Sequence, residues 1–436
     1  MEFCYDVLGG FGMNTSGLSA PFKTNFYYGW VIVFIAGLGV FFSGPGQTYS
    51  VSVFIDSYIK DFGWSRSHVS AVYSLATLAA GICMFFVGRF VDKWGQRKMS
   101  VIVGIGLAFA SFWNSMVVNT AMLFIGFFLI RVLGQGSMSL IPNTLVPQWF
   151  ITKRGKAMSL MAIGGFASSA ALPPLNAWLV ATWGWSFSWK VWGILLLVVF
   201  VPLAYLLIRN KPEDIGEYPD GVKRNWTNDH ADPNRTSKHF EEVNWTVQEA
   251  VKTRAYWLLL FCVGIPSLVN TGLTFHLISI FKTNGISPGI AALVLSLMAL
   301  IGFPVTLIAG PLLDRVKVQY VLAGIFAGEI IFILVLLAAD RTAIAIIFGV
   351  LWGISGGFER ITLNYVWPSF FGRQSLGSIK GSAMTVTVLG SALGPLPFGL
   401  AFDLFGGYEE ILLFSIILPV LGITASLLAK KPVKEG

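Results

Sequence analysis

Long apolar runs separated by short polar stretches dominate the chain. A helix of about 20 residues, rising about 1.5 Å per residue, crosses the roughly 30 Å hydrocarbon layer of a membrane. The runs are continuous rather than alternating, which favours helices over the strands of a membrane barrel. We therefore predict an all-α integral membrane protein with twelve transmembrane helices, at 28–56, 69–88, 99–117, 121–146, 157–182, 191–208, 256–281, 290–313, 321–339, 343–368, 378–402 and 411–429.

The composition agrees with this pattern, because 55% of the 436 residues are hydrophobic and only 12% are charged. A chain of this size with so few charges cannot cover an ordinary soluble surface. The composition therefore excludes a soluble globular protein.

The sequence is duplicated. The segment GRFVDK at 88–93 corresponds to GPLLDR at 310–315, and a constant offset of 222 positions, the difference between 310 and 88, relates them. The same offset pairs other glycines and prolines without a gap: Gly63 with Gly285, Gly106 with Gly328, Gly155 with Gly377, Pro173 with Pro395 and Gly184 with Gly406. A period this long indicates two half-molecules rather than a solenoid. We predict pseudo-symmetric six-helix bundles at 28–208 and 254–429, a linker at 209–253, and tails at 1–27 and 430–436.

The net charge of +8 is distributed unevenly along the chain. Arg131 and Arg360 fall inside predicted helices, and 23 of the 30 Lys and Arg residues lie on the side of the two termini. Only five lie on the other side: Lys60, Arg66, Lys190, Lys282 and Arg341. This bias predicts cytoplasmic termini in a multi-pass plasma-membrane protein, and it argues against nucleic acid as a partner. Short outer loops without glycosylation sites favour a bacterial inner membrane.

The sequence contains no signature of an enzyme or of a cofactor site. The three cysteines, Cys4, Cys83 and Cys262, are scattered, so they support neither a disulfide framework nor a metal site. A Walker loop, a dinucleotide fingerprint and a His-Glu-x-x-His motif are all absent. We expect no enzymatic activity and no cofactor.

The segment GRFVDKWGQRK after the second predicted helix resembles the GxLxDRxGRR signature of the major facilitator superfamily, and GPLLDR resembles its second copy. The resemblance covers the whole chain, because twelve helices, a central linker and cytoplasmic termini also fit. It implies that this loop closes the cytoplasmic ends of the two bundles in the outward-facing state. The residues implied in this conformational latch are Gly88, Asp92, Gly95, Arg97, Asp314 and Arg315.

Three further segments are similar to the monocarboxylate-porter and oxalate/formate-antiporter branch: YGWV at 28–31, WF at 149–150 with RGKA at 154–157, and NKPEDIG at 210–216. Those relatives tend to carry an Arg in helix 8 and a basic residue deep in helix 1 or 11. Here helix 8 is uncharged, and Lys380 lies only at the mouth of helix 11. The binding residues are therefore sought among this chain's own intramembrane groups.

An ionised side chain at mid-bilayer is disfavoured by about 2.5–3.5 kcal/mol, so each one requires a partner or a function. In the superfamily that the chain resembles, helices 1, 4, 7 and 10 line the central cavity, and Arg131 and Arg360 fall on that set. Two guanidinium groups favour an anion, because Arg binds a carboxylate with two parallel hydrogen bonds. The predicted substrate-binding residues are Arg131, Arg360, Gln47, Tyr49, Asn270 and Asn364. A structural role stays open as the alternative for each Arg. For Arg131 this would be a buried ion pair or binding to backbone carbonyls.

Proton coupling is assigned to His276 or Glu359, and anion exchange without a titrating group is equally open. Glu329 lies on helix 9, which is peripheral in that superfamily, and we interpret it as structural. The Gly44-Pro45-Gly46 segment and Pro266 predict breaks at similar places in helices 1 and 7, of the kind found at binding regions.

The function predicted from these features is secondary active transport of a small organic anion, a mono- or dicarboxylate, by alternating access. The expected partners are that anion, membrane lipid and protons, and the expected functional unit is a monomer. A proton-driven drug or cation efflux antiporter is the first alternative. A non-transporting membrane sensor is the second.

Overall fold

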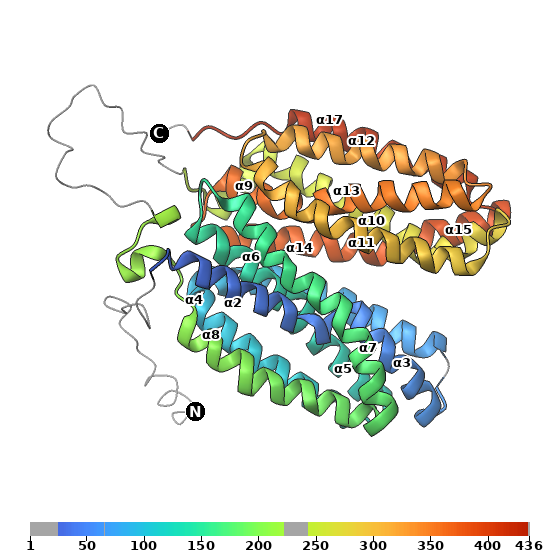
Figure 1. The fold of residues 1–436 in the computed structure, drawn as a ribbon, viewed down its shortest axis with the longest axis horizontal. Helices are drawn as coiled ribbons and strands as arrows, with labels where there is room; N and C mark the ends of the chain where they lie inside the picture. The colour runs from blue at the N-terminus through green and yellow to red at the C-terminus, as the bar shows by residue number, and fades with distance from the viewer. Residues whose placement is uncertain (1–24, 65, 222–242, 435–436) are drawn as a thin grey trace.

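The computed structural model describes residues 25–64, 66–221 and 243–434. Most of the predicted N-terminal tail and the middle of the predicted linker lie outside these residues. The secondary structure of the described residues is entirely helical, and no strand occurs among them. Figure 1 shows two groups of long helices lying side by side, with the N-terminal half in blue and green and the C-terminal half in yellow to red. The predicted all-α class is confirmed.

The N-terminal bundle is built from these helices: α2 (Gly29–Phe42), η1 (Gly44–Gly46), α3 (Thr48–Phe62), α4 (Arg66–Asn114), α5 (Thr120–Ile130), η2 (Arg131–Ser137), α6 (Met138–Trp149), α7 (Arg154–Leu195), η3 (Leu196–Phe200) and α8 (Val201–Leu207). Two short 3-10 turns follow in the linker, η4 (Pro212–Ile215) and η5 (Pro219–Gly221).

The C-terminal bundle begins after the linker helix α9 (Val247–Lys252). Its helices are α10 (Arg254–Thr283), α11 (Pro288–Leu313), α12 (Val318–Leu337), α13 (Thr342–Phe371), α14 (Leu376–Leu393), α15 (Pro395–Phe405), α16 (Glu409–Ser415) and α17 (Ile417–Leu428).

Ten segments of the described chain are long and apolar enough to span a membrane. Two of them, α4 and α7, each contain a glycine with a positive φ, at Gly95 (φ 77°) and Gly184 (φ 80°), where the chain reverses between two spans. A side chain is strained in this conformation. At Gly95 a Cβ would also lie 2.7 Å from the Asn210 amide nitrogen. Counting both sides of each break gives the predicted twelve crossings.

The first transmembrane helix is interrupted where the sequence predicted, because η1 separates α2 from α3. The break predicted at Pro266 is wrong, since α10 continues through that residue from Arg254 to Thr283. Pro266 is buried against neighbouring helices, and such packing holds a proline-containing membrane helix together. Of these two related helices, only the first is interrupted.

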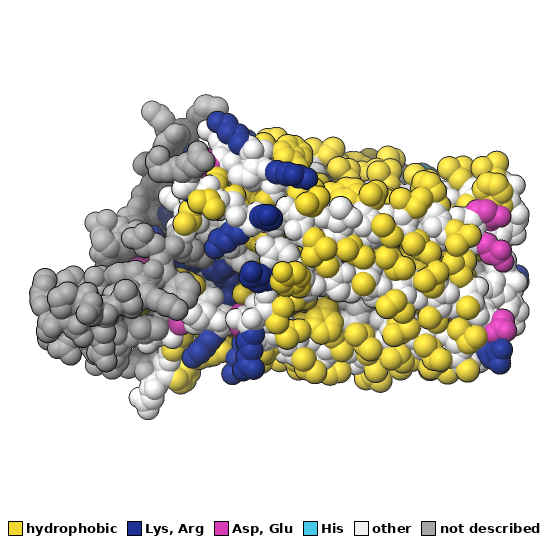
Figure 2. Space-filling model, turned by 90° about the horizontal axis from the view of Figure 1, so that it is seen from above, with side chains coloured by type: hydrophobic (Ala, Val, Ile, Leu, Met, Phe, Trp, Pro, Cys, Tyr) yellow, Lys and Arg dark blue, Asp and Glu magenta, His cyan; other side chains and the backbone are white. Residues whose placement is uncertain are grey.

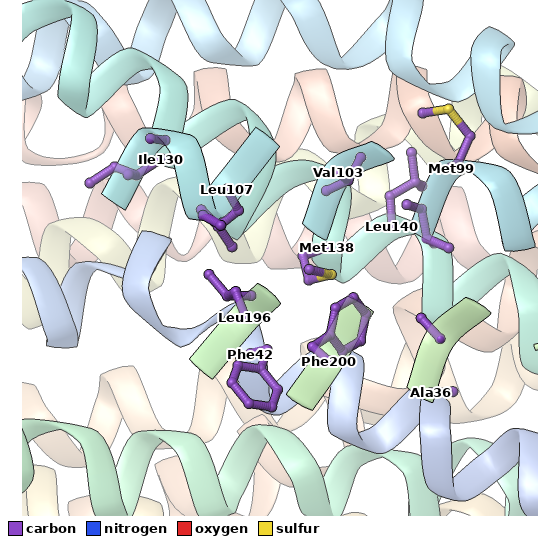
Figure 3. Packing of buried hydrophobic residues seen from close by; sticks show 14 of the residues in the cluster. Ala36, Phe42, Met99, Val103, Leu107, Ile130, Met138, Leu140, Leu196 and Phe200 are labelled. Carbon is purple, nitrogen blue, oxygen red and sulfur yellow. The ribbon is translucent and has the colours of Figure 1, made fainter. Parts of the chain in front are cut away.

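The interior of the N-terminal bundle is filled by apolar side chains from non-consecutive helices. Figure 3 shows Phe42 of α2 beside Phe200 of η3, with Met138 of α6 and Val103 of α4 close by. Their close packing fixes α2 and its break against the helices that carry the polar groups described below.

The two ends of the bundles differ in charge. Figure 2 shows a broad band of hydrophobic side chains, with Lys and Arg gathered at one end and acidic groups at the other. We call the end where Lys and Arg gather the basic end. The apolar band matches a membrane-embedded surface.

A buried polar cluster links α3 to α7. The Asn176 amide donates to the Ser50 hydroxyl (2.8 Å), and the Trp192 indole N–H donates to the Asn176 carbonyl oxygen (2.7 Å). We expect Asn176→Leu to destabilise the protein by about 1–3 kcal/mol, because it leaves two buried groups without partners. Thermal unfolding in detergent measures the loss. Ser52→Ala, at an exposed α3 position, is the control, and equal melting temperatures for Asn176→Leu and the unsubstituted protein would contradict the assignment.

Candidate functional site

The two halves are joined at the basic end by two carboxylates that cap helix N-termini in the opposite bundle. Asp92 of α4 accepts hydrogen bonds from the backbone amides of Gly377 and Ser378, both at 2.7 Å. Asp314, after α11, accepts from the amides of Gly155 (2.7 Å) and Lys156 (3.1 Å). A carboxylate at a helix N-terminus satisfies free N–H groups and interacts favourably with the helix dipole.

These two contacts are related by the internal duplication, since each member of one pair lies 222 positions from its counterpart in the other. Burial raises the pKa of the Asp314 carboxyl, and the hydrogen bonds from the Gly155 and Lys156 amides act in the opposite direction. The crossed arrangement ties α4 to α14 and α11 to α7 at the same level of the bundle. It closes the basic end.

Glycines allow the helices to approach closely at this closure. A Cβ on Gly88 would lie 2.2 Å from the Gly377 carbonyl oxygen, and one on Gly155 would lie 2.0 Å from the Gly310 carbonyl oxygen. Both distances are far below van der Waals contact, so a side chain at either position would force the halves apart. Small residues at helix crossings in membranes allow such close approach of the backbones.

The other predicted latch residues do not bridge the halves in the described contacts. The Arg97 backbone amide donates to the Asn210 side-chain oxygen, and its Nε donates to the Tyr205 carbonyl, both within the N-terminal half. Gly95 forms the reversal beside Asn210. Arg315 is exposed at the basic end.

Arg131 lies in the N-terminal half, where it binds the broken segment of the first transmembrane helix. Its Nη1 donates to the Gly46 carbonyl and to the Thr48 hydroxyl, both at 3.2 Å. The guanidinium lies over the Tyr73 ring, 5.0 Å from the centroid. Arg131 opens the π-helical turn η2, an irregularity that often marks functional positions.

The Arg131 guanidinium is only partly satisfied, because its Nε is buried without a partner among the described residues. The Thr77 hydroxyl is in the same state. Both groups border a small cavity that Gln135 also lines, and Val388 of α14 closes it from the other half. The cavity therefore lies between the two bundles.

Arg360 comes from the C-terminal half and approaches the same broken segment. Its guanidinium lies 4.6 Å from the centre of the Phe166 ring in the N-terminal half, and the side chain retains exposed surface. The hydroxyl of Tyr49 donates to Ser168 (2.8 Å), which lies on α7 two residues after Phe166. Arg360 therefore contacts the part of α7 that binds Tyr49, while Arg131 contacts Thr48, the residue before it.

The other predicted polar ligands have protein partners. Gln47 donates through its amide to the hydroxyls of Ser43 (3.1 Å) and Ser139 (3.3 Å), and Asn364 donates to the Arg360 carbonyl (2.9 Å). The side-chain oxygens of Gln47 and Asn364 accept no hydrogen bond from any described residue.

The Asn270 side chain links α10 to α13. Its amide donates to Glu359 (3.0 Å), and its oxygen accepts from the Trp352 indole N–H (2.9 Å). Glu359 is followed in sequence by Arg360, and its helix α13 packs against α12, which carries Glu329. Glu329 is buried, and neither of its oxygens has a hydrogen-bond partner among the described residues.

His276 lies away from the two arginines, in contacts with its own half. Its Nε2 is 3.1 Å from the Pro395 carbonyl, and its Nδ1 is 3.2 Å from the Tyr408 hydroxyl. A carbonyl only accepts, so Nε2 carries the proton; in the neutral ring, Nδ1 then accepts from Tyr408. Both nitrogens are occupied.

Lys380 is the residue whose importance the sequence analysis missed. Its side chain is 4% exposed. Its ammonium donates to the carbonyls of Asn143 (3.2 Å) in one half and Asn364 (3.3 Å) in the other. A lysine near the start of an otherwise uncharged helix was the available signal, but the sequence analysis noted only its place at the mouth of that helix. Within the described chain, no group of three or more His, Cys, Asp or Glu side chains could hold a metal.

Comparison with known proteins agrees with this architecture. The family model described as Major Facilitator Superfamily matches residues 29–395. The chain is 27% identical to human Monocarboxylate transporter 2 over 397 residues, or 88% of this chain and 81% of that one. It is 24% identical to an aspyridones efflux protein of Emericella nidulans over 418 residues, or 93% and 78%. A crystal structure of a double-tryptophan XylE mutant shares the fold, with a TM-score of 0.67, 16% identity and coverage of 92% and 94%.

The crossed carboxylates give a test of the closure at the basic end. We expect Asp92→Asn or Asp314→Asn to open this end, because each removes a charge-assisted contact worth about 1.5–3 kcal/mol. The measurement is maleimide labelling of a cysteine introduced at Ala383, which is 5% exposed, in a protein without its native cysteines. Labelling should become at least about tenfold faster.

Asp340→Asn is the matched control, because Asp340 is exposed and pairs only with the neighbouring Arg341 in the described contacts. It should leave labelling unchanged. Equal labelling rates in all three variants and the parent would show that the carboxylates do not hold the halves together.

Proposed function

The chain belongs to the Major Facilitator Superfamily, a family of membrane transporters rather than enzymes, and from this premise we propose that it carries a small organic carboxylate by alternating access. The family match confirms the resemblance seen in the sequence. The proposal concerns what the family alone leaves open: the substrate class, the coupling and the orientation in the membrane.

The observation that carries the proposal is the pair of guanidinium groups that approach Thr48 and Tyr49 from the two halves. Arg131 contacts Thr48 in the N-terminal half, and Arg360, from the C-terminal half, contacts Phe166 of α7, two residues before the Ser168 hydroxyl that binds Tyr49. Arg131 keeps a buried donor without a described partner, and Arg360 keeps exposed surface. A carboxylate between them would receive charge-assisted hydrogen bonds from both halves.

Binding from both halves suits alternating access, because a substrate that contacts both bundles favours conformations in which the bundles close around it. Tyr49 and the acceptor oxygens of Gln47 and Asn364 are placed to bind hydroxyl groups on such an anion. Asn270 holds Glu359 through one N–H and keeps a second N–H donor for the substrate.

The orientation proposed follows from the charge asymmetry. The basic end faces the cytoplasm, which places both termini inside a bacterial plasma membrane. The structure is then an outward-facing state closed by Asp92 and Asp314. The working unit proposed is a monomer. The human relative is named for monocarboxylate transport, which supports an organic anion at low identity.

Efflux of a drug or cation is the competing function, and the fungal relative is named as an efflux protein. Such a carrier needs an acidic group free to meet a cation. Glu359 is the acid nearest to the arginines in sequence, but it accepts a hydrogen bond from Asn270 and stands next to Arg360. The carboxylate reading is therefore favoured.

The substrate role of the arginines is tested by uptake into proteoliposomes of labelled lactate, pyruvate, oxalate, formate and succinate. We expect uptake of at least one, reduced at least about tenfold by Arg131→Gln or Arg360→Gln, because each removes a charged hydrogen-bond donor. Arg341→Gln is the matched control, since Arg341 is exposed at the opposite end and pairs with Asp340.

Full uptake by Arg131→Gln, with equal amounts of protein in the membrane, would overturn the binding role of that residue. If the unsubstituted protein takes up none of these acids, the carboxylate proposal is wrong. Export of cationic dyes from the same vesicles then tests the efflux alternative.

We place proton coupling at Glu359 rather than at His276, because Glu359 adjoins Arg360, whereas both nitrogens of His276 are held within one half. Glu359→Gln keeps an oxygen for the Asn270 amide but cannot titrate. We expect it to lose stimulation of uptake by an inward proton gradient while keeping exchange against internal substrate.

His276→Gln serves as the matched variant and should retain the stimulation. The reverse result, loss in His276→Gln and retention in Glu359→Gln, would move the coupling to the histidine. If uptake of the unsubstituted protein responds only to internal anion, the carrier is an exchanger and neither group couples protons.

A further inference from the structure

A hollow of about 390 Å³ lies on the side of the C-terminal bundle, among α11, α12 and α13. The residues that line it are almost entirely apolar. Five of them have exposed side chains: Leu312, Val316, Tyr320, Ile331 and Ile354. The hydroxyl of Ser355 in its wall donates to the Ile325 carbonyl, so it does not require water. Neither Arg131 nor Arg360 lines the hollow, and it belongs to none of the functions proposed above.

The groove arises from glycine on α12. A Cβ built on Gly324 would meet nothing within 4 Å, so the space in front of this residue is not filled by protein. The position related by the duplication is Ile102, which is exposed on the N-terminal bundle, and the counterpart of Gly328 is Gly106, which lies against Leu133. The C-terminal half therefore has a hollow where the N-terminal half presents a side chain.

The length and position of the groove match one leaflet of a bilayer. Its α12 wall runs from Tyr320 to Ile331, twelve residues whose Cα atoms span about 16 Å along the helix. This is about half of the roughly 30 Å hydrocarbon layer. The groove begins at the basic end, where Arg315 and Lys317 are exposed and form no ion pair with any described residue. Two cations therefore stand at the headgroup level above an apolar channel.

We propose that this groove is a binding site for an anionic glycerophospholipid, with one acyl chain along Gly324 and the phosphate held by Arg315 and Lys317. The apolar walls contribute van der Waals contacts with the chain, which is already out of water in the bilayer. The two cations attract the anionic phosphate at the membrane surface. Ordinary lipid contact with the bundle would show neither a headgroup preference nor dependence on these residues.

The bound phosphate would lie next to the closure of the basic end, because Arg315 directly follows Asp314. Asp314 caps α7 of the opposite half in this structure. Lipid bound at this site could therefore affect the closure at the basic end. The proposal does not depend on the transported substrate; it requires only the membrane-spanning fold.

The test uses photoactivatable phosphatidylglycerol and phosphatidylcholine with identical diazirine-labelled acyl chains, in nanodiscs containing the full-length protein. Cross-linked peptides are mapped by mass spectrometry. We expect phosphatidylglycerol to label the segment 316–331 at least about fivefold more than phosphatidylcholine does. Gly324→Ile, which introduces the residue of the symmetric position, should reduce this labelling at least about fivefold, and so should the double variant Arg315→Gln, Lys317→Gln.

Lys93→Gln is the matched control, because Lys93 is the symmetric counterpart of Arg315 and is also exposed. It should leave the labelling of 316–331 unchanged. Unaltered melting temperatures establish that each variant is folded. Equal labelling by both lipids, or labelling that survives both the Gly324 and the double variant, would overturn the proposal and identify the groove as ordinary annular contact.

Discussion

The hydrocarbon layer offers no water to polar groups, and this constraint underlies every unusual feature of the molecule. Where the first transmembrane helix breaks at η1, the freed Gly46 carbonyl is bound by the Arg131 guanidinium. The break requires a donor, and the buried arginine requires acceptors. Each therefore stabilises the other, and together they leave an incompletely satisfied cation in the middle of the protein.

The same constraint shapes the contact between the halves. Helix N-termini at the basic end present free amide groups, which Asp92 and Asp314 satisfy from across the interface. Because these bonds join separate bundles, they can break and be replaced by water at the membrane surface without disrupting either bundle. The glycines beneath them permit the close approach on which the bonds depend. A closure made this way is both specific and reversible.

The buried and exposed cations differ in the hydrogen-bond acceptors that surround them. Lys380 is buried at the interface with two carbonyls as acceptors, one from each half. Arg360 instead retains exposed surface above Phe166. The two cations differ in their capacity to take an anion, although the sequence shows each only as one positive residue in an apolar helix. Lys380 therefore joins the halves, whereas Arg360 has the exposed surface on which the proposed substrate role depends.

The sequence by itself determined the helical class, the twelve crossings, the duplication and the asymmetry of charge, because these follow from local hydrophobicity and from repeated residues. It also singled out Asp92, Asp314, Arg131 and Arg360. Only the tertiary structure decided that Asp92 caps α14, that α10 passes unbroken through Pro266, and that Lys380 is buried. These outcomes depend on which helices pack together, and residues far apart in sequence become neighbours only through that packing.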